Sequence, residues 1–479
     1  MQRITDLASL DLFDVAASRR IEQATAAQLP PHTLMRRAGL AVARLAAALV
    51  PHARTVWVAC GPGNNGGDGF EAAAQLQLRG FDVRISFAGD EARLPPDALD
   101  ALARARQAGV PIAAEPPAEY DLAIDALLGL GATRAPAEAM ARWLERIYRS
   151  GRPVLCVDLP SGLDADTGTA RFDFGHGGPR HCLSLLTLKP GVFTGQGRDA
   201  AGEVWFDDLG CEPGPEVPAA RLNAAPAAQP RAHATHKGSY GDVAVLGGAP
   251  GMAGAALLAA SAALHAGAGR VFVALLDTSL APLSRVQPEL MFRAPASLDW
   301  SALTTVCGCG GGDAVQAMLP RVLAASPRLV LDADALNAIA ADAALAPMLA
   351  GRRSQGWQTV LTPHPLEAAR LLGTDTAGVQ SDRLAGARTL AERFQSVVVL
   401  KGSGSVIAAP GKVPFLNLSG NARLATGGTG DVLAGMIGAE LAAGHDATAA
   451  ARRAVWRHGA LADRWPQGRP LTAGALAGG

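Results

Sequence analysis

Two glycine-rich loops, one in each half of the chain, carry an acidic residue at the start of an expected helix. The first, Gly61 to Gly69, reads GPGNNGGDG, and the second, Ala425 to Asp431, reads ATGGTGD. Backbone N–H groups that no side chain covers bind anions, and the positive end of the helix dipole strengthens this binding. A carboxyl group beside such a loop can take or deliver a proton. The two loops therefore predict two active sites in one chain.

In the first half, further polar side chains follow expected strands. Asp125 ends one strand, and Asp158 ends another directly before Leu159-Pro160-Ser161-Gly162. Ligands of open parallel sheets bind at the carboxyl ends of the strands, so these groups are expected to gather with the first loop. The loop lacks the Lys and Ser/Thr of a Walker A sequence, and hard oxygen donors suit an alkali or alkaline-earth cation. A single Asp more often caps a turn, but the combination favours a site.

In the second half, Lys401 to Ser405 follows a strand and Asp431 opens an apolar helix. Asp431 could take a proton from a hydroxyl that faces a bound phosphate. The structural alternatives are an N-cap for Asp431 and a solvated surface position for Lys401. His364 lies between two prolines and is expected to contact a ligand. Asp334 lies in a second motif at a strand end, and its structural alternative is to cap the helix that follows.

Short apolar runs alternate with Ala/Leu-rich helical stretches throughout, which is typical of parallel sheets covered by helices. In the first half the expected strands are Thr55–Cys60, Asp82–Phe87, Leu122–Asp125 and Pro153–Asp158. In the second half they are Asp242–Leu246, Arg270–Ala274, Leu303–Cys307, Arg328–Leu331, Thr359–Leu361 and Ser396–Leu400. Both halves are therefore predicted to be α/β. The proline-rich stretch Glu212–Arg231 shows neither helical nor strand periodicity and is predicted to be the linker between domains 1–224 and 225–479.

Composition narrows the class of protein. The 479 residues include 43 Lys plus Arg and 43 Asp plus Glu, so bulk charge gives no reason to expect nucleic acid or a membrane surface as partner. The six cysteines lack the spacing of a zinc site, and the N-terminus lacks the pattern of a secretory signal. Met252–Gly269 is Ala/Gly-rich and is predicted to be a buried helix, not a membrane span. A cytoplasmic protein with small-molecule substrates is expected.

The first half resembles the NAD(P)H-hydrate epimerase domain. The resemblance rests on the stretch Arg20–Ala41, on GPGNNGGDGF at Gly61–Phe70, DALLGLG at Asp125–Gly131, VDLPSGLDADTG at Val157–Gly168 and LKPG at Leu188–Gly191. It implies a Rossmann-like three-layer α/β/α domain with Asp158 as general acid and base, and a potassium ion held by Asn65, Asp125 and Ser161. The implied substrate contacts are Asn64, Asn65, Gly66, Gly67, Asp68, Gly129, Leu130, Gly131, Ala132, Thr133, Arg134, Ala135 and Asp158.

The second half resembles the ADP/ATP-dependent NAD(P)H-hydrate dehydratase, which has a ribokinase-like α/β fold. The matching stretches are His236–Gly248, Gly251–Ala260, Leu331–Ala340, Thr362–Gly373 and Asn417–Gly435. The implied nucleotide contacts are Lys401, Gly402, Ser403, Gly404, Ser405 and Gly430. The implied contacts with the hydrated substrate are Gly254, Ala255, Gly310, His364 and Asp431, with Asp431 as the catalytic base. Where the family usually reads GPGLG, this chain has Gly308-Cys309-Gly310-Gly311-Gly312.

Together the resemblances imply a bifunctional repair enzyme. One half would interconvert the R and S forms of NADH hydrate and NADPH hydrate, and the other would dehydrate the S form with ADP, or ATP, and Mg²⁺. K⁺ is the implied ion of the first site, a homo-oligomer is implied, and neither nucleic acid nor membrane is expected as partner. Two alternatives stay open at this point: a ribokinase-like kinase of a small alcohol with a regulatory first half, and a catalytically silent first half that only binds nucleotide or another protein.

Overall fold

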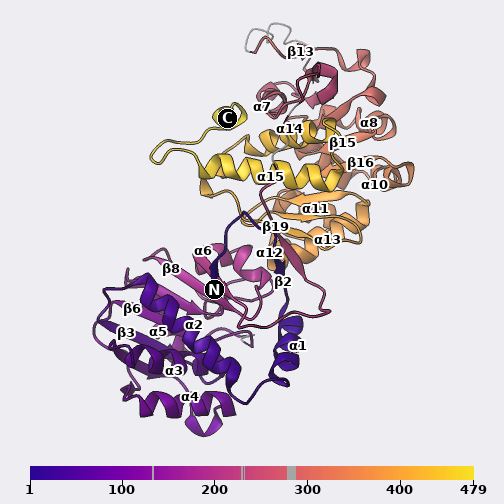
Figure 1. Ribbon diagram of the computed structural model, residues 1–479. Coiled ribbons are helices and arrows are strands. Elements are labelled where there is room, and N and C mark those ends of the chain that lie inside the picture. The colour runs from indigo at the N-terminus through magenta and orange to yellow at the C-terminus, as the bar shows by residue number, and fades with distance from the viewer. Residues whose placement is uncertain (132–133, 228–229, 231, 278–286) are drawn as a thin grey trace. The chain divides into compact units, whose positions relative to one another are not determined.

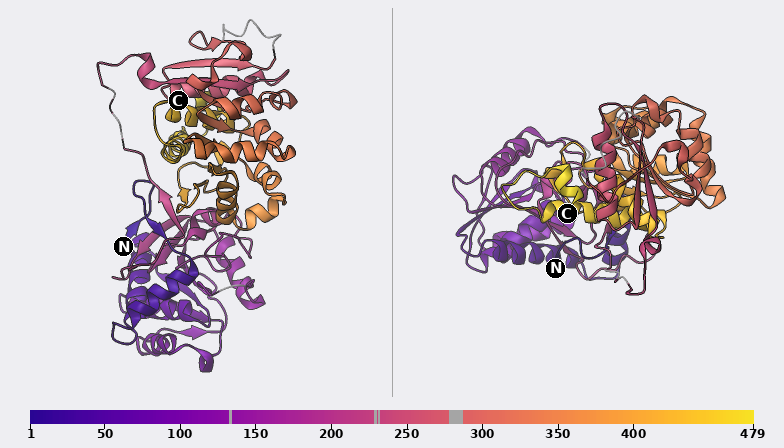
Figure 2. Two further views of the ribbon diagram at one scale, coloured as in Figure 1. Left: turned by 90° about the vertical axis from the view of Figure 1, so that its right-hand side faces the viewer. Right: turned by 90° about the horizontal axis from the view of Figure 1, so that it is seen from above.

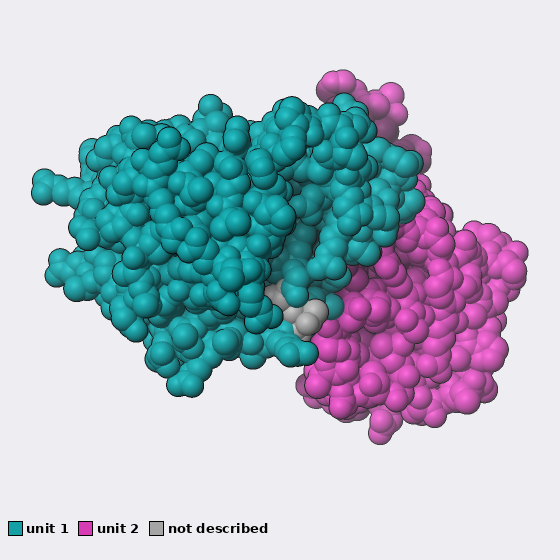
Figure 3. Space-filling model, turned by 90° about the horizontal axis from the view of Figure 1, so that it is seen from below, with its two compact units in different colours: residues 1–5, 11–220 teal, residues 6–10, 221–479 magenta. Residues whose placement is uncertain are grey.

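The computed structural model describes residues 1–479 except 132–133, 228–229, 231 and 278–286. Within it, the chain divides into two compact units, which Figure 3 colours separately. Unit 1 comprises Met1–Thr5 and Asp11–Ala220, and unit 2 comprises Asp6–Leu10 and Arg221–Gly479. The two units are defined by their compactness, whereas a domain is a part that folds independently. The expected domains 1–224 and 225–479 therefore remain a prediction.

Unit 1 contains a twisted, mostly parallel sheet between helices (Figure 1). Its strands are β1 (Gln2–Arg3), β2 (Asp11–Leu12), β3 (Thr55–Cys60), β4 (Asp82–Phe87), β5 (Ile112–Ala113), β6 (Leu122–Ala126), β7 (Val154–Val157), β8 (Arg180–Leu185) and β9 (Glu203–Asp207). Its helices are α1 (Val15–Ala26), α2 (Thr33–Leu49), α3 (Asn64–Gln77), α4 (Pro96–Gln107), α5 (Glu138–Arg149) and α6 (Gly197–Ala201). The strand order is β1-β9-β8-β7-β6-β3-β4-β5, and only β1 runs antiparallel to its neighbour in this order.

The alternation of side chains along β3 explains the two helical layers of unit 1. Val56 and Val58 pack into one core with α2, α3 and α4, whereas Trp57 points to the opposite face and stacks edge-on against Trp143 of α5 at 6.5 Å. Successive side chains of a strand face opposite sides, so a central strand buried on both faces is apolar throughout. The sheet order reverses next to β3, which places a topological switch point between β3 and β6.

Unit 2 is also α/β, and the right-hand view of Figure 2 shows its strands running between helices. Its strands are β10 (Ala220–Asn223), β11 (Asp242–Gly247), β12 (Arg270–Leu275), β13 (Met291–Phe292), β14 (Thr304–Cys307), β15 (Arg328–Leu331), β16 (Gln358–Leu361), β17 (Val397–Leu400), β18 (Val406–Ala408) and β19 (Phe415–Asn417). Its helices are α7 (Ala253–His265), α8 (Leu319–Ala325), α9 (Ala333–Ala341), α10 (Leu345–Gly351), α11 (Pro365–Leu372), α12 (Thr376–Ser381), α13 (Arg383–Phe394), α14 (Thr429–Ala442), α15 (Ala447–Asp463) and α16 (Ala473–Ala477).

The strands of unit 2 follow the order β13-β12-β11-β14-β15-β16-β17-β18-β19-β10. All neighbouring pairs are parallel except β17 with β18 and β18 with β19. The order reverses between β11 and β14, so the loops after β11 and β14 diverge at the carboxyl edge of the sheet. That edge is where a ligand of such a sheet is expected to bind.

Helices α7 and α14 touch through their backbones. A Cβ atom on Gly435 of α14 would lie 2.0 Å from the carbonyl oxygen of Ala259, so only glycine permits this approach. Ala256, Ala260 and Ala263 of α7 are fully buried in the same core. The prediction of a tightly packed buried helix within Met252–Gly269 is therefore confirmed. Among the described residues, no single helix is long and apolar enough to cross a membrane; α9 with the stretch 345–355 passes that test only as a pair bent by 116°.

The α/β class predicted for both halves is confirmed, and each expected strand is present within about a residue of its expected bounds. One part of an expectation is wrong: Glu212–Arg231 was expected to hold no strand, but it contains β10, which pairs in parallel with β19 and places Leu222 opposite Leu416. The boundary between the two units, after Ala220, lies within the same stretch. Four residues reading Ala-Arg-Leu-Asn carry no periodicity of their own, so this strand depends on the neighbour that pairs with it.

Candidate active sites

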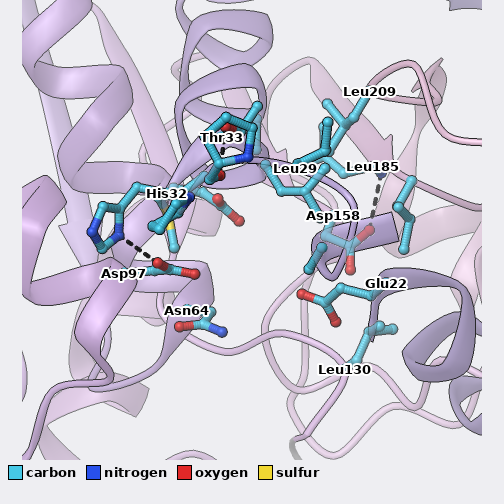
Figure 4. Close-up of a pocket in the computed structure, with 18 of the residues that line it drawn as sticks. Glu22, Leu29, His32, Thr33, Asn64, Asp97, Leu130, Asp158, Leu185 and Leu209 are labelled. Atoms are coloured by element: carbon cyan, nitrogen blue, oxygen red, sulfur yellow. Dashed lines mark hydrogen bonds and ion pairs between the residues drawn. The ribbon is translucent and has the colours of Figure 1, made fainter. Parts of the chain in front are cut away.

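Unit 1 holds a cavity of about 210 Å³ beside the carboxyl ends of its central strands. Its wall includes Glu22 of α1, Asn64 and Asp68 of α3, Leu130, and Asp158 directly after β7. Figure 4 shows the Glu22 and Asp158 carboxyl groups on one side of the cavity and Asn64 with the His32–Asp97 pair on the other. The cavity is thus lined by carboxyl groups and by apolar side chains such as Leu29 and Leu185.

Asp158 is fixed by a buried ion pair. Its Oδ1 accepts a hydrogen bond from the backbone N–H of Leu185 at 3.0 Å and contacts the ammonium group of Lys189. The Lys189 side chain is 1% exposed and also donates to the carbonyl oxygen of Leu185 at 2.7 Å. A charge removed from water needs a partner of opposite charge, so each residue of this pair holds the other in place. Asp158 has a φ of +67°, a left-handed conformation that turns the chain sharply after the strand.

Two other carboxyl groups in this wall lack such partners. Within the described part of the chain, Glu22 and Asp68 form no hydrogen bond or ion pair. Burial raises the pKa of Glu22, and the nearby charge of Asp158 raises it further. Burial raises the pKa of Asp68 well above its ordinary value, again with a contribution from Asp158. Both groups therefore favour the protonated form more than an exposed carboxyl does.

A second polar cluster surrounds Asp125, which does not line the cavity. This side chain is fully buried in β6; its Oδ1 accepts from Ser161 Oγ at 2.6 Å, and its Oδ2 accepts from Ser161 N and Tyr148 Oη, both at 3.0 Å. Burial raises the pKa of Asp125, although the hydrogen bonds from Ser161 oppose this effect. The structure therefore joins Asp125 and Ser161 directly.

Asn65 belongs to the same neighbourhood through Gly129. A Cβ atom on Gly129 would lie 3.1 Å from Cβ of Asn65, and the preceding residue, Leu128, donates its N–H to Ser161 Oγ at 2.8 Å. Nδ2 of Asn65 is buried and has no hydrogen-bond partner. Carboxylate, hydroxyl and amide oxygens are hard donors. The unpartnered Nδ2 of Asn65 is an N–H donor, so only the Oδ1 of this amide could face a cation. The donor types here fit a cation such as K⁺.

The other predicted contacts of the first site divide into three groups. Asn64, Asn65, Gly66, Gly67 and Asp68 form the first turns of α3, and a Cβ atom on Gly66 would lie 2.0 Å from the carbonyl oxygen of Gly61. Gly131 lies near the guanidinium of Arg19, whereas Arg134 and Ala135 are exposed and do not line the cavity. Ala132 and Thr133 lie outside the described residues.

The segment Phe172–Arg180 covers the back of the Asp125 cluster. Phe174 stacks edge-on against Tyr148 at 4.9 Å, and Phe172 lies 6.2 Å from the same ring. The guanidinium of Arg180 lies 5.3 Å from the ring centre of Tyr148 and donates to the carbonyl oxygens of Phe174 and Gly175. Tyr148, which the sequence interpretation did not include, is thereby held with its hydroxyl on Asp125.

In unit 2, Asp431 is the third residue of α14, and the N-cap is Gly428 with a φ of +92°. Capping is therefore not its role. Burial raises the pKa of Asp431 to about 6, with a further contribution from the charge of Asp332. A carboxylate oxygen of Asp431, one of Asp332 and the Sγ of Cys309 all lie within 4.8 Å of one another. Asp431 is thus a base whose proton affinity is raised by a second acid at the carboxyl edge of the sheet.

Lys401 is not a solvated surface lysine. Its Nζ lies 2.7 Å from Oδ1 of Asp332 and 3.8 Å from Oε2 of Glu367, and its side chain is 19% exposed. Burial alone would lower the pKa of Lys401, but Asp332 and Glu367 raise it, so the ammonium form is retained. Thr362 Oγ1 also donates to Asp332 at 2.7 Å. This fixed cation lies 3.3 Å from where a Cβ atom on Gly430 would be, directly at the start of α14.

His364 is the N-cap of α11. Its Nδ1 accepts from the backbone N–H groups of Leu366 and Glu367 at 3.1 and 3.2 Å, and its Nε2 lies 3.2 Å from Oε1 of Glu367. Burial lowers the pKa of His364, and the charge of Lys401 lowers it further. The ring is therefore oriented by the helix, and a ligand contact from this position remains a prediction.

The remaining predicted contacts of unit 2 lie in glycine-rich turns. Gly310 has a φ of +58°, and a Cβ atom there would lie 2.9 Å from Cβ of Ala255; the position of Gly254 is open. Gly402 and Gly404 also have positive φ, and Ser405 Oγ donates to the carbonyl oxygen of Gly402 at 3.2 Å. Gly402 and Ser403 are exposed, while Gly404 is buried. The buried guanidinium of Arg383 holds the start of this turn through the carbonyl oxygens of Leu400 and Lys401, both at 3.2 Å.

Several functional side chains were missed by the sequence interpretation. Lys189 lies inside the LKPG stretch and Glu367 inside TPHPLE, so both motifs were recognised but neither residue received a role. A lysine or a glutamate within an apolar motif at a strand end indicates a buried ion pair, because a buried charge requires a partner. Glu22 lies inside the matching stretch Arg20–Ala41 and likewise received no role.

Two family models match the chain. Residues 31–191 match the model described as YjeF-related protein N-terminus, and residues 243–476 match the model described as NAD(P)H-hydrate dehydratase. The ADP-dependent (S)-NAD(P)H-hydrate dehydratase of Neisseria meningitidis serogroup B is 43% identical over 256 residues, which cover 52% of this chain and 85% of that protein. A Bacillus subtilis ADP/ATP-dependent NAD(P)H-hydrate dehydratase, co-crystallised with ATP/Mg²⁺, aligns with 31% identity over 52% of this chain and 90% of its own, at a TM-score of 0.45.

Full-length relatives cover both units. The bifunctional NAD(P)H-hydrate repair enzyme Nnr of Escherichia coli (strain K12) is 36% identical over 458 residues, covering 92% of this chain and 87% of that protein. The enzyme of the same name from Coxiella burnetii is 34% identical over 472 residues, covering 95% and 94%. This chain belongs to the family of bifunctional NAD(P)H-hydrate repair enzymes.

Proposed function

We propose that unit 1 interconverts the R and S forms of hydrated NADH and NADPH, and that unit 2 converts the S form back to NADH or NADPH at the expense of ADP. The observation that carries this proposal is the presence of a separate acid–base site in each unit of a chain that a bifunctional relative matches over 92% of its length. A dehydratase that accepts one epimer needs an epimerase to clear the other, which accounts for both sites on one chain.

The chemistry of the first site follows from the structure of the substrate. The hydrate is a hemiaminal, so the C6 hydroxyl can leave with help from the ring nitrogen, and water can return to either face. A carboxyl group beside C6 assists both steps by giving and taking a proton. Asp158 is the residue proposed for this role, because it lines the cavity and its orientation is fixed by Lys189 and Leu185.

We assign K⁺ to the oxygen donors of Asn65, Asp125 and Ser161. The Asp125 carboxylate, which is bonded to Ser161 Oγ, and the position of Asn65 beside Gly129 support this assignment. When bound, the ion supplies positive charge that offsets the buried carboxylate and fixes the loop after β6. Tyr148 keeps Asp125 oriented toward Ser161.

The chemistry of the second site is leaving-group activation. Hydroxide leaves poorly, but transfer of a phosphoryl group from ADP to the C6 hydroxyl gives a phosphate ester. Loss of phosphate from C6 and of a proton from C5 then restores the ring double bond. Asp431 takes the hydroxyl proton, and its pKa of about 6 keeps most of it ionised at neutral pH while leaving it more basic than an exposed carboxylate. Lys401 and the N–H groups at the start of α14 lie where they can stabilise the transferring group.

ADP is the proposed donor because the Neisseria meningitidis relative, at 43% identity, carries ADP dependence in its name. Mg²⁺ with the nucleotide supplies charge neutralisation for phosphoryl transfer, and the carboxylates of Asp332 and Asp431 are hard donors suited to it. The hydrated nucleotide is proposed to contact Gly254, Ala255, Gly310 and His364. A cytoplasmic homo-oligomer is the state we expect for the working enzyme.

The test uses the full-length protein with a mixture of R and S NADH hydrate, K⁺, Mg²⁺ and either ADP or ATP, followed at the absorbance band of reduced nicotinamide. Complete recovery of NADH is expected, and the faster nucleotide identifies the donor. Recovery of the S fraction alone would contradict the epimerase assignment. No recovery with either nucleotide would favour a kinase of a small alcohol with a regulatory first unit.

A further inference from the structure

Glu22 and Asp158 face the same cavity from different parts of the chain. Glu22 comes from α1 near the N-terminus, and Asp158 follows β7 (Figure 4). Their carboxyl groups lie on one wall of the cavity. They are close enough together for the charge of Asp158 to raise the pKa of Glu22. Because the two groups come from different elements, a ring whose edge met this wall between them would have one carboxyl group at each face.

The fold holds Glu22 in this position by a specific contact. Asp14 caps α1 by accepting from the backbone N–H of Ala17 at 2.7 Å. One turn before Glu22, the buried Ser18 Oγ lies 2.7 Å from Thr187 Oγ1, two residues before Lys189. Residues four apart share one face of a helix, so Glu22 projects on the face that Ser18 fastens to this loop. The contact brings the carboxyl group of α1 to the loop that carries the partner of Asp158.

The two carboxyl groups differ in what satisfies them. Asp158 has an ammonium partner and a backbone donor, whereas Glu22 has neither a hydrogen bond nor an ion pair among the described residues. A half-buried carboxyl group without a partner lowers stability, which is typical of a group retained for catalysis. Burial raises the pKa of Glu22, and the charges of Asp158 and Asp97 add to this effect. Lys189 and Arg19 lower the pKa, but each by less than burial raises it. Asp68 faces the same space.

We propose that Glu22 is a second catalytic residue of the epimerase site, which protonates the departing C6 hydroxyl at one face while Asp158 accepts a proton from the water that adds at the other. This inference rests on the function proposed for unit 1. It assigns one face of the ring to each carboxyl group, and the reverse epimerisation uses the same pair with exchanged roles.

The step balances without any further reactant. The C6–O bond breaks with its electron pair on oxygen, and the proton of Glu22 converts that oxygen to water. The lone pair of the ring nitrogen forms the C=N bond of an iminium cation, which the two neighbouring carboxyl groups stabilise. Water then adds to C6, the π electrons return to nitrogen, and the released proton goes to Asp158. The proton returns from Asp158 to Glu22 through water in the cavity, and no group is oxidised or reduced.

The experiment compares the wild type with Glu22→Gln, Glu22→Asp and the exposed control Glu119→Gln. Purified R hydrate of NADH is incubated with the full-length protein and K⁺ but without nucleotide, so that only epimerisation occurs, and the R/S ratio is followed by chromatography. Glu22→Gln is expected to slow epimerisation by about 100-fold or more, as removal of a general acid does. Glu22→Asp is expected to retain more activity than Glu22→Gln, and Glu119→Gln to match the wild type.

Two readouts separate catalysis from a folding defect. ADP-dependent dehydration of the S form by Glu22→Gln is expected to stay within about twofold of the wild type, since unit 2 does not contain Glu22. Exchange of ¹⁸O from water into the C6 hydroxyl is expected to fall together with epimerisation. Wild-type epimerisation by Glu22→Gln, or equal loss in the Gln and Asp variants, would overturn the role of Glu22. A wild-type protein that fails to epimerise would instead overturn the function proposed for unit 1.

Discussion

Replacing Asp431 by Asn is expected to stabilise the protein while abolishing dehydration. Burial and the neighbouring Asp332 raise the pKa of Asp431 from 3.8 to about 6, so the folded state binds a proton more tightly than the unfolded chain does. At pH 8 the side chain is ionised in both states, and the folded state bears the full cost of the buried charge. The difference of 2.2 pH units at about 1.4 kcal/mol each gives an upper limit of about 3 kcal/mol.

The sign of the effect sets its pH dependence. Because the folded pKa is raised, the destabilisation is complete above pH 6 and disappears as pH falls toward 3.8. The advantage of Asp431→Asn is therefore expected to be at most about 3 kcal/mol at pH 8 and to shrink to about half of its pH 8 value at pH 5. For a unit of this size, each kcal/mol moves the melting temperature by about 2–4 °C.

Thermal and urea unfolding of the wild type, Asp431→Asn and the exposed control Asp313→Asn at pH 8 and pH 5 test this reasoning. The control is expected to behave as the wild type at both values. An Asn variant no more stable than the wild type at pH 8, or one whose advantage is as large at pH 5, would show that Asp431 is not a strained base. Epimerisation by the same variant is expected to be unchanged.

Three further predictions follow from buried contacts. Lys401→Met leaves the carboxylate of Asp332, which is 2% exposed, without its ammonium partner. A loss of about 3–5 kcal/mol in unfolding free energy and no measurable dehydration are expected, with epimerisation retained as the control activity. Tyr148→Phe removes one donor from the buried Asp125 and is expected to cost about 1.5–3 kcal/mol by urea denaturation; an unchanged midpoint would contradict that contact. Replacing K⁺ by Li⁺ is expected to slow epimerisation and leave dehydration of the S form unaffected, and equal rates in both salts would remove the ion from the first site.

The sequence predicted the sheets well because their central strands are apolar on both faces. Runs such as Thr55–Cys60 and Arg328–Leu331 have few other ways to be buried, and the structure has them with those bounds. Strand β10 was missed because its short, polar sequence becomes a strand only through pairing with β19. The buried helix α7 was also predictable, because its alanines can pack closely against neighbouring elements.

The sites were predictable only as far as single motifs reach. Asp158 follows a strand and Asp431 lies in the first turn of a helix, so both could be predicted from local sequence. The ion pairs beside them join distant parts of the chain: Lys189 lies 31 residues after its partner Asp158, and Lys401 lies 69 residues after its partner Asp332, the acid next to Asp431. Sequence separation of this kind hides ion pairs, and it explains why Lys401 had a surface position as its alternative while the structure buries it against Asp332.

The six cysteines give the protein a built-in reporter of opening. All are buried and unpaired, and burial raises the pKa of the thiols of Cys60, Cys156, Cys182, Cys307 and Cys309. A covered, protonated thiol does not react with alkylating reagents, so modification requires local or global unfolding. Cys60, Cys156, Cys182 and Cys211 belong to unit 1, and Cys307 and Cys309 belong to unit 2. Alkylation rates resolved by peptide mass would thus measure the opening of each unit separately, in the unmodified chain and without an introduced label.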